Sequence, residues 1–202
     1  MLLFDHLVVR LVFPNRHKVS REMWRAAQPL PHQIAAAKRR GIKTIVNLRG
    51  RTKTATYAYE RAACSKAGIK MVDFRVKSRD APTKEELLGA REVFASIEYP
   101  ALMHCKSGAD RAGLASVLYR HIHDGAPIED AMKHLSLRYG HIAQANTGII
   151  DHFFEAYLAY AKTNPIPFYD WVETVYDPQE LKQSFKSNSW ANRLVDSVLK
   201  RE

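Results

Sequence analysis

The chain has 202 residues, of which 46% are hydrophobic, and a formal net charge of +10 at pH 7. This length suits one large domain or one domain with an appendage, and the apolar fraction is sufficient for a core. The apolar runs are shorter than the roughly 20 residues of a membrane span, and charged residues interrupt the hydrophobic N-terminus, which argues against a transmembrane segment or a signal peptide. We therefore expect a soluble, cytoplasmic protein.

The charge and the cysteine content indicate which partners and cofactors to expect. A net positive charge favours anionic partners, namely phosphorylated substrates, anionic lipid surfaces or nucleic acid, although a generally basic surface gives the same charge. Cys64 and Cys105 are too few for a disulfide scaffold and lack the spacing of a metal site. We expect no metal, no cofactor and a reducing compartment, in which a free thiol is available for chemistry.

Up to Cys105 the sequence predicts alternating strands and helices. Strands are expected where β-branched or apolar residues cluster, and helices where apolar positions recur at helical spacing before a glycine. The expected strands are 23–28, 44–48, 71–76 and 101–105, and the expected helices are 31–40, 54–67 and 83–97. Thr83 and Glu86 form a capping-box pattern at the start of the last helix. This alternation with short connections predicts an α/β fold with a central, largely parallel sheet flanked by helices.

Beyond Cys105 the hydrophobic pattern becomes helical. Apolar residues recur at helical spacing around 114–122, 128–135 and 150–158. A break follows at Asn164-Pro-Ile-Pro167, and the apolar residues from Trp190 to Leu199 predict an amphipathic terminal helix. We interpret 1–162 as the main domain and 163–202 as a helical appendage packed on it. Contact of the appendage with a partner or a membrane surface is the alternative.

One segment combines the residue types that bind and attack a phosphate group. His104-Cys-Lys-Ser-Gly-Ala-Asp-Arg111 follows an expected strand and precedes an expected helix. The strand delivers Cys105 to the edge at which α/β proteins bind ligands. Gly108 lets successive backbone N–H groups turn inward, and the helix adds the positive end of its dipole. Residues 105–111, called here the signature loop, therefore predict a cradle for a tetrahedral dianion.

The signature loop also predicts roles for two side chains. Cysteines at helix N-termini or beside cations ionise more readily than a free thiol, so we expect Cys105 to be a thiolate that attacks phosphorus in line. The Arg111 guanidinium offers a planar fork that matches two phosphate oxygens and stabilises charge in the transition state. A buried cysteine followed by an ordinary turn is the alternative without catalysis.

The H-C-x-x-G-x-x-R pattern resembles the signature of the protein-tyrosine and dual-specificity phosphatase superfamily. The segments Trp24-Arg-Ala-Ala-Gln-Pro29 and Gly41-Ile-Lys-Thr-Ile-Val-Asn-Leu-Arg49 look like the opening of atypical dual-specificity members. The resemblance covers roughly residues 25–158 and implies the cysteine-phosphatase fold, a phosphocysteine intermediate and no metal. It implies a tyrosine or dual-specificity protein phosphatase, with 1–162 as the phosphatase domain.

The resemblance carries over to individual positions of the signature loop. Cys105 is the implied nucleophile and Arg111 the implied phosphate clamp. The implied substrate-binding residues lie between them and are Lys106, Ser107, Gly108, Ala109 and Asp110.

A general acid is also implied, because the leaving oxygen needs a proton. The family keeps an Asp on a mobile loop after the strand that precedes the signature strand. The matching region here is Val76-Lys-Ser-Arg-Asp-Ala-Pro82, and Asp80 is our candidate. A turn Asp that helps to cap the next helix is the alternative. Asp73 is the second candidate, although it lies within an expected strand, where it would be less mobile.

Two residues depart from the family pattern. The family usually has Ser or Thr directly after the arginine, whereas this chain has Ala112. The missing hydroxyl is expected to slow hydrolysis of the phosphoenzyme unless Ser107 or a water replaces it. Asp110 places a carboxylate inside the loop, where it would repel a phosphate. We expect Asp110 to point away from the pocket and to bond a backbone N–H or a neighbouring base.

Other polar residues near the motif have weaker assignments. Lys106 suits a substrate with extra negative charge, such as a phosphoinositide, or is a solvated surface base. His104 is expected to be a structural hydrogen-bonding residue. Gln144 or Asn146 would position the hydrolytic water, unless loop polarity alone explains them. Cys64 fits a packed helix position better than a redox partner of Cys105.

Several other functions stay under consideration. An RNA 5′-phosphatase would use the basic charge, but no aromatic-basic module is evident, so no nucleic-acid partner is expected. Rhodaneses and arsenate reductases also use a reactive loop cysteine, but the full eight-residue pattern disfavours them. The partner is expected to be a phosphorylated protein or phospholipid. A sugar-phosphate phosphatase and a phosphate-binding pseudophosphatase, which Ala112 allows, are the remaining alternatives.

Overall fold

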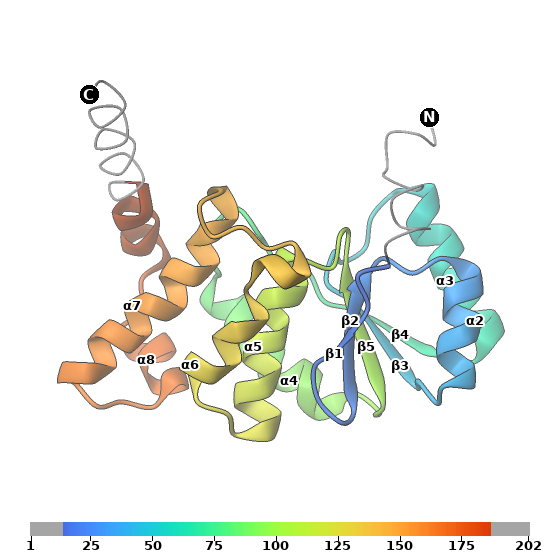
Figure 1. Ribbon diagram of the computed structural model, residues 1–202, viewed down its shortest axis with the longest axis horizontal. Coiled ribbons are helices and arrows are strands. Elements are labelled where there is room, and N and C mark those ends of the chain that lie inside the picture. The colour runs from blue at the N-terminus through green and yellow to red at the C-terminus, as the bar shows by residue number, and fades with distance from the viewer. Residues whose placement is uncertain (1–13, 187–202) are drawn as a thin grey trace.

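A computed structural model describes residues 14–186 and places a five-stranded sheet between layers of helices (Figure 1). The strand order is β1-β2-β5-β3-β4. The strands are β1 (His17–Lys18), β2 (Met23–Ala27), β3 (Thr44–Asn47), β4 (Lys70–Asp73) and β5 (Ala101–Cys105). β1 pairs with β2 in antiparallel fashion, whereas β2, β5, β3 and β4 are parallel. The expected α/β fold with a largely parallel sheet is confirmed.

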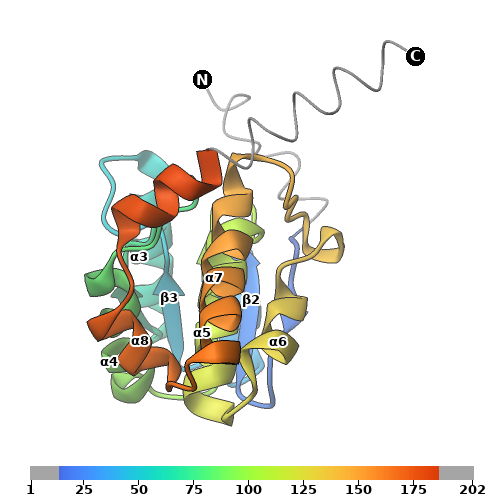
Figure 2. The same cartoon turned by 90° about the vertical axis from the view of Figure 1, so that its left-hand side faces the viewer.

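The helices cover both faces of this sheet (Figures 1 and 2). One face carries α2 (Pro31–Arg39) and α3 (Ala55–Ala67), which pack against each other. The other carries α4 (Lys84–Ser96) and α5 (Asp110–Asp124). This second layer continues with α6 (Ile128–Ala131), α7 (Ile149–Thr163) and α8 (Phe168–Thr174). The helical C-terminal half is therefore confirmed as far as residue 186.

Alternating strand residues supply the two cores. Ile45 and Leu102 pack towards α2 and α3, whereas Val46 and Met103, the next residue on each strand, pack towards α4 and α5. This two-residue alternation is what a pleated strand produces when helices cover both of its faces. Strands β3 and β5 are buried along their whole length, so the residues that follow β5 start from a rigid position.

Local signals in the sequence account for most helix ends. Thr83 Oγ1 accepts a hydrogen bond from the Glu86 N–H at 3.2 Å, and Glu86 Oε2 accepts one from the Thr83 N–H at 2.9 Å. This reciprocal pair is the predicted capping box, and it starts α4. Gly68 ends α3 in the left-handed conformation that glycine adopts without strain.

Two elements are shorter than predicted. The strand expected over 71–76 ends at Asp73, because its neighbour β3 ends opposite it at Asn47. The helix expected over 128–135 has one α-helical turn, and a 3-10 turn over Met132–His134 follows it. The His134 carbonyl accepts a hydrogen bond from Arg25 at 2.7 Å, so the chain bends towards β2 at this point.

The segment after α7 contributes to the same core. Phe168 and Trp171 of α8 are buried against Phe153 of α7 in an aromatic cluster. The Tyr176 hydroxyl donates a hydrogen bond to the Pro82 carbonyl at 2.7 Å, which ties this segment to the start of α4. The division of the chain at residue 162 stays a prediction. The amphipathic helix expected over 190–199 lies outside the described residues.

Within residues 14–186, no helix has both the length and the apolar content that crossing a bilayer requires.

Candidate active site

Four parallel strands end at one edge of the sheet, called here the carboxyl edge. Because β2, β3, β4 and β5 run in the same direction, the segments that leave them emerge together. The signature loop leaves β5 at this edge and leads into α5. The segment that carries Asp80 leaves β4 at the same edge. The topology therefore brings the predicted nucleophile and the predicted acid to one side of the molecule.

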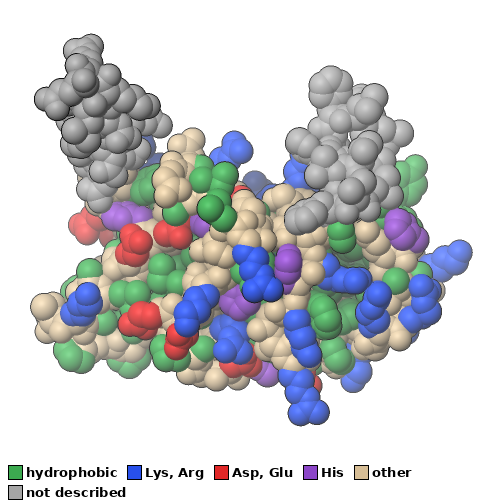
Figure 3. Space-filling model, viewed as in Figure 1, with side chains coloured by type: hydrophobic (Ala, Val, Ile, Leu, Met, Phe, Trp, Pro, Cys, Tyr) green, Lys and Arg blue, Asp and Glu red, His purple; other side chains and the backbone are tan. Residues whose placement is uncertain are grey.

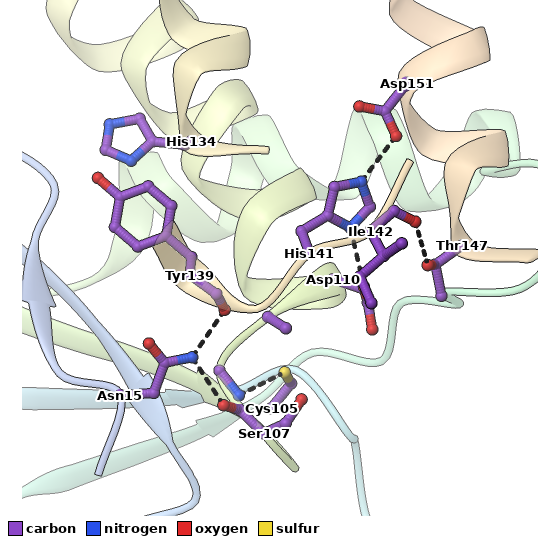
Figure 4. Close-up of polar contacts among 12 residues, drawn as sticks. Asn15, Cys105, Ser107, Asp110, His134, Tyr139, His141, Ile142, Thr147 and Asp151 are labelled. Atoms are coloured by element: carbon purple, nitrogen blue, oxygen red, sulfur yellow. Dashed lines mark hydrogen bonds and ion pairs between the residues drawn. The ribbon is translucent and has the colours of Figure 1, made fainter. Parts of the chain in front are cut away.

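The backbone of the signature loop folds around the Cys105 sulfur. The Cys105 side chain is buried, and its Sγ accepts a hydrogen bond from the Gly108 N–H at 3.2 Å (Figure 4). Gly108 has a φ of +76°, which favours glycine. A Cβ at this position would lie 2.6 Å from the Ala26 carbonyl carbon and from the Ala27 nitrogen. Only glycine therefore lets the loop pass this close to β2.

The carbonyl groups of the signature loop bond to residues near the start of the described chain. The Lys106 carbonyl accepts a hydrogen bond from the Gln28 N–H at 3.3 Å. The Asn15 side-chain amide donates to the Ser107 carbonyl at 2.9 Å and also to the Tyr139 carbonyl at 2.9 Å (Figure 4). Arg25 binds the next two carbonyls of the loop, those of residues 108 and 109.

Arg111 is the last residue of the signature loop and lies in the first turn of α5. Its side chain is partly buried, and it makes no hydrogen bond or ion pair with any residue in 14–186. A guanidinium beside the loop amides that has no acidic partner within residues 14–186 is suited to binding an anion. The geometry thus provides a thiol, amide donors, a helix N-terminus and a cation within one short segment.

Asp110 bonds a neighbouring base, as the sequence predicted. His141 Nδ1 lies 2.8 Å from Asp110 Oδ1, and His141 Nε2 lies 2.7 Å from Asp151 Oδ2 (Figure 4). Burial lowers the pKa of His141, but the hydrogen bonds to Asp110 and Asp151 outweigh burial and raise it to about 9. A charged His141 therefore joins the start of α5 to α7 at neutral pH.

His104 occupies a buried polar network under the nucleophile. Its Nε2 lies 2.5 Å from Glu60 Oε1 on α3, and both side chains are almost fully buried. The Gln28 side-chain amide donates to the second oxygen of Glu60 at 2.7 Å. Burial and the nearby Glu60 carboxylate raise the pKa of Cys64, also on α3, to about 12. The role expected for His104 stays a prediction, whereas Cys64 lies in the apolar core between α3 and the sheet, as expected.

Asp80 lies on a loop whose two ends are fixed in the core. Val76 and Ala81 are buried, whereas the Asp80 side chain is 36% exposed. Its carboxylate lies 2.8 Å from Lys182 Nζ and 3.9 Å from Lys77 Nζ. The hydrogen bond to Lys182 lowers the pKa of Asp80. The loop is at the expected edge, but in this conformation the carboxylate is held in its charged form.

The other predicted positions have fewer contacts. Gln144 and Asn146 are exposed on the turn between His141 and α7, and their side chains make no hydrogen bond within residues 14–186. Asp73, the second acid candidate, is fixed by the Asn47 amide at 2.9 Å and by the Tyr57 hydroxyl at 2.6 Å. Their roles stay predictions.

Comparison with known proteins identifies the family. Residues 14–149, more than half of the chain, match the family model PTP-NADK, described as a DSP-PTPase phosphatase fused to NAD+ kinase. The matched range contains all of the described strands and the signature loop. The chain belongs to the PTP-NADK family. The resemblance noted in the sequence to dual-specificity phosphatases is thereby confirmed.

Individual relatives of this PTP-NADK family chain are distant. It is 27% identical over 122 residues to the dual specificity protein phosphatase TpbA of Pseudomonas aeruginosa strain UCBPP-PA14, a match that covers 60% of this chain and 53% of TpbA. The matched part of the chain therefore spans about half the length of the curated relatives that it matches.

Solved structures share the fold of the chain. The crystal structure of P. aeruginosa TpbA matches with a TM-score of 0.57 and 20% identity, covering 84% of this chain and 89% of that one. Tk-PTP in its active form matches with a TM-score of 0.54 and 17% identity, covering 70% and 97%. A cysteine-to-serine variant of TpbA in complex with pTyr matches with a TM-score of 0.55 and 22% identity, covering 71% and 90%.

Several residues at the site of this PTP-NADK family chain were not predicted from its sequence. They are Asn15, Arg25, Glu60, His141 and Asp151. Of these residues, Arg25 alone had a local signal in the sequence. It lies between the apolar residues of an expected strand, and a buried charge needs a specific partner. The remaining contacts join segments that are distant in the sequence.

The contacts of His141 with Asp110 and Asp151 predict a pH-dependent contribution to the free energy of unfolding. Because the folded-state pKa of about 9 lies above the ordinary value of 6.5, the contribution is complete below pH 6.5 and is lost as the pH rises through 9. At about 1.4 kcal/mol per pKa unit, it amounts to a few kcal/mol. We expect His141→Gln to lower the free energy of unfolding at pH 6 and to have a much smaller effect at pH 9.5, as measured by urea denaturation.

A matched control separates this effect from a general loss of ion pairs. Arg120 forms an i, i+4 pair with Asp124 on the same helix as Asp110, and an arginine stays charged over this pH range. Arg120→Gln should change stability by a small amount that is similar at both pH values. A His141→Gln effect that is equally independent of pH would contradict the prediction.

Proposed function

We propose that the chain hydrolyses phosphomonoesters through a phosphocysteine at Cys105, as a tyrosine or dual-specificity protein phosphatase. One arrangement supports this most directly. The Cys105 sulfur is buried against the Gly108 amide at 3.2 Å. It directly precedes a helix whose first turn carries Arg111, which has no ion-pair partner among residues 14–186. Amides, helix dipole and guanidinium all favour negative charge at the same point. Membership of a phosphatase family and the pTyr complex of TpbA are consistent with this proposal.

In the first proposed step, the Cys105 thiolate attacks the phosphorus atom. A sulfur–phosphorus bond forms while the bond from phosphorus to the leaving oxygen breaks, and a general acid protonates that oxygen. The loop amides and Arg111 stabilise the charge on the three equatorial oxygens. The products of this step are the free alcohol or phenol and phosphocysteine.

In the second proposed step, water attacks phosphocysteine, releasing inorganic phosphate and restoring the thiolate. Gln144 or Asn146 is our candidate to position that water. Ala112 is fully buried on α5 and has no hydroxyl to offer the departing sulfur. We therefore expect this step to be slower than the first, which gives a burst of alcohol or phenol release.

Asp80 is the proposed general acid, and its effect should depend on the leaving group. Because an acid must carry its proton, the 77–82 loop has to move Asp80 away from Lys182 before it can act. We expect Asp80→Asn to lower kcat/KM, which reports the first step, about 10²- to 10⁴-fold on phenyl phosphate, whose leaving group needs the proton. The loss should be much smaller on p-nitrophenyl phosphate, and steady-state kinetics on both substrates measure it.

Asp73→Asn is the matched control, because Asp73 is a fixed carboxylate near the same edge. It should affect both substrates alike. Equal losses on the two substrates in Asp80→Asn would reject Asp80, and a leaving-group dependence in the Asp73 variant would transfer the role to Asp73.

A second substrate class is favoured by the charges at the carboxyl edge. Lys53 follows β3, and Arg75 and Arg79 follow β4; none of the three makes an ion pair with any acid in residues 14–186. On the face shown in Figure 3, Lys and Arg side chains spread over the half that holds β1, β2 and α2, whereas Asp and Glu gather over α6 and α7. Bases at the carboxyl edge that have no acidic partner within residues 14–186 favour a phosphomonoester that carries further negative charge, such as a phosphoinositide or a sugar bisphosphate.

A substrate panel tests the function and separates these classes. It compares a phosphotyrosine peptide, a phosphothreonine peptide, vesicles that contain phosphatidylinositol phosphates, and a soluble sugar bisphosphate. The protein-phosphatase proposal predicts the highest kcat/KM on a phosphopeptide, inhibition by vanadate and no effect of EDTA. A preference for the phosphoinositide or the sugar bisphosphate that falls steeply with salt would favour the second class. Release of no phosphate from any of the four would contradict both.

A further inference from the structure

Arg25 is a buried cation without an acidic partner. It lies in the middle of β2, its exposed fraction is 0%, and no Asp or Glu in residues 14–186 forms an ion pair with it. Removing a charge from water is unfavourable unless specific groups replace the water. The groups that replace water around Arg25 therefore indicate what it does.

Those groups are backbone carbonyls, two of which belong to the signature loop. Arg25 Nη2 donates to the Gly108 carbonyl at 2.8 Å and to the Ala109 carbonyl at 2.8 Å. Arg25 Nη1 donates to the His134 carbonyl at 2.7 Å. The Tyr139 ring covers the guanidinium, with its centroid 4.3 Å from Cζ. One arginine thus joins β2, the signature loop and the segment after α6.

Holding these carbonyls determines where the loop amides point. The C=O and the N–H of a trans peptide point in opposite directions across the peptide plane. The peptide between Ser107 and Gly108 shows the result, because Asn15 holds its C=O while its N–H donates to the Cys105 sulfur. Arg25 holds the C=O groups of the next two peptides. Their N–H groups, which belong to residues 109 and 110, are thereby directed away from β2.

The charge of Arg25 also acts on the nucleophile. Burial lowers the pKa of Arg25 to about 10, whereas the Cys105 sulfur, Tyr139 and Asp110 act in the opposite direction. The guanidinium therefore stays charged at neutral pH. This buried charge interacts with the Cys105 sulfur, because screening by water is weak in the interior, and we expect its removal to lower the reactivity of the sulfur.

We propose that Arg25 is a positioning residue of the active site, which turns the carbonyls of the signature loop towards β2 so that its amides face the phosphate, and whose charge raises the reactivity of the Cys105 sulfur. This inference rests on the proposed phosphatase function. Arg25 does not touch the substrate in this role. It acts through the loop that does.

Two Arg25 variants test the proposal with three measurements. Arg25→Gln removes the charge and the fork, and Arg25→Lys keeps the charge but loses the fork. The first measurement is kcat/KM on p-nitrophenyl phosphate. The second is the rate at which iodoacetamide alkylates Cys105 at pH 7. The third is the tungstate concentration that protects Cys105 from this alkylation. We expect Arg25→Gln to lower kcat/KM on the order of 100-fold, the loss that misplacement by about 1 Å produces. It should also slow the alkylation of Cys105 at least about tenfold and raise the protective tungstate concentration by a similar factor. A tenfold change corresponds to about 1.4 kcal/mol of lost interaction.

The lysine variant separates charge from geometry. Arg25→Lys should keep alkylation near the wild-type rate but still weaken tungstate protection. Ile34→Ala is the control for loss of stability, because it creates a cavity in the core on the other face of the sheet. The proposal is overturned if Arg25→Gln resembles Ile34→Ala in all three measurements. It is equally overturned if both Arg25 variants fold and tungstate protects Cys105 in them at the same concentration as in the wild-type protein.

The same measurements distinguish this proposal from the proposed function. If the wild-type protein releases no phosphate from any substrate, while alkylation and tungstate protection still respond to Arg25 as expected, the phosphatase proposal fails and the role of Arg25 in the loop stands. If Arg25→Gln does not fold, Arg25→Lys decides through the tungstate measurement.

Discussion

Cys105→Ser is expected to abolish turnover while leaving the fold and anion binding in place. A serine hydroxyl fits the space of the thiol, and the amides of the signature loop do not depend on the sulfur. The hydroxyl, however, stays protonated at neutral pH, so the nucleophile is lost. Loss of a nucleophile alone lowers rates by roughly 10⁴-fold or more, which is the drop we expect in kcat on p-nitrophenyl phosphate. Tungstate binding, measured by calorimetry, should be retained.

The second cysteine of the chain provides the control. Cys64 is buried on α3 under the opposite face of the sheet, and burial raises its pKa to about 12. Cys64→Ser places a hydroxyl in an apolar site and should lower stability without removing activity. Turnover that survives in Cys105→Ser but disappears in a folded Cys64→Ser would contradict the assignment of the nucleophile.

Gly108→Ala should reduce both stability and activity strongly. A φ of +76° is unfavourable for alanine by about 1–2 kcal/mol. The added Cβ would also lie 2.6 Å from the Ala26 carbonyl carbon and the Ala27 nitrogen, which are backbone atoms of a buried strand. Overpacking of this kind costs about 1–3 kcal/mol more, and the loop has to shift away from β2. We expect a loss of about 2–5 kcal/mol in urea denaturation and, because the amides move, a fall in kcat/KM of at least about 100-fold.

Gly125→Ala separates the effect of the positive φ from the effect of the close contact that Gly108 makes with β2. Gly125 has a φ of +66°, but nothing lies within 4 Å of the position its Cβ would take. This variant should lose only the about 1–2 kcal/mol of the left-handed conformation and should keep wild-type activity. If Gly108→Ala and Gly125→Ala lose equal stability and Gly108→Ala stays fully active, the loop does not depend on its contact with β2.

The fold was predictable where the signals are local. β3 and β5 follow from short apolar runs, and α4 follows from the capping box at Thr83, because both patterns act within a few residues. The signature loop was predictable for a related reason. A strand, a glycine and a helix start placed in sequence determine where Cys105 and the loop amides go.

The contacts that hold the loop could not be predicted in this way. Arg25 and the Gly108 carbonyl are 83 residues apart, Asn15 and Ser107 are 92 apart, and His141 and Asp110 are 31 apart. No local pattern sets such distances, since they arise when β2 pairs with β5 and when α7 packs beside α5. The pairing of Asp80 with Lys182 is also a tertiary contact. It lowers the pKa of Asp80 and so stabilises the charged form of a residue whose proposed role requires the proton.

Rapid-quench trapping of the phosphoenzyme tests the central claim most directly. The protein is mixed with excess p-nitrophenyl phosphate, quenched in acid at millisecond times, and the mass of the peptide that contains Cys105 is measured. We predict that one phosphoryl group appears on Cys105 within the burst of nitrophenol, stays at that level while substrate is present, and decays at the rate of steady-state turnover once the substrate is removed. Steady release of phosphate without any phosphoryl group on Cys105 would contradict the account.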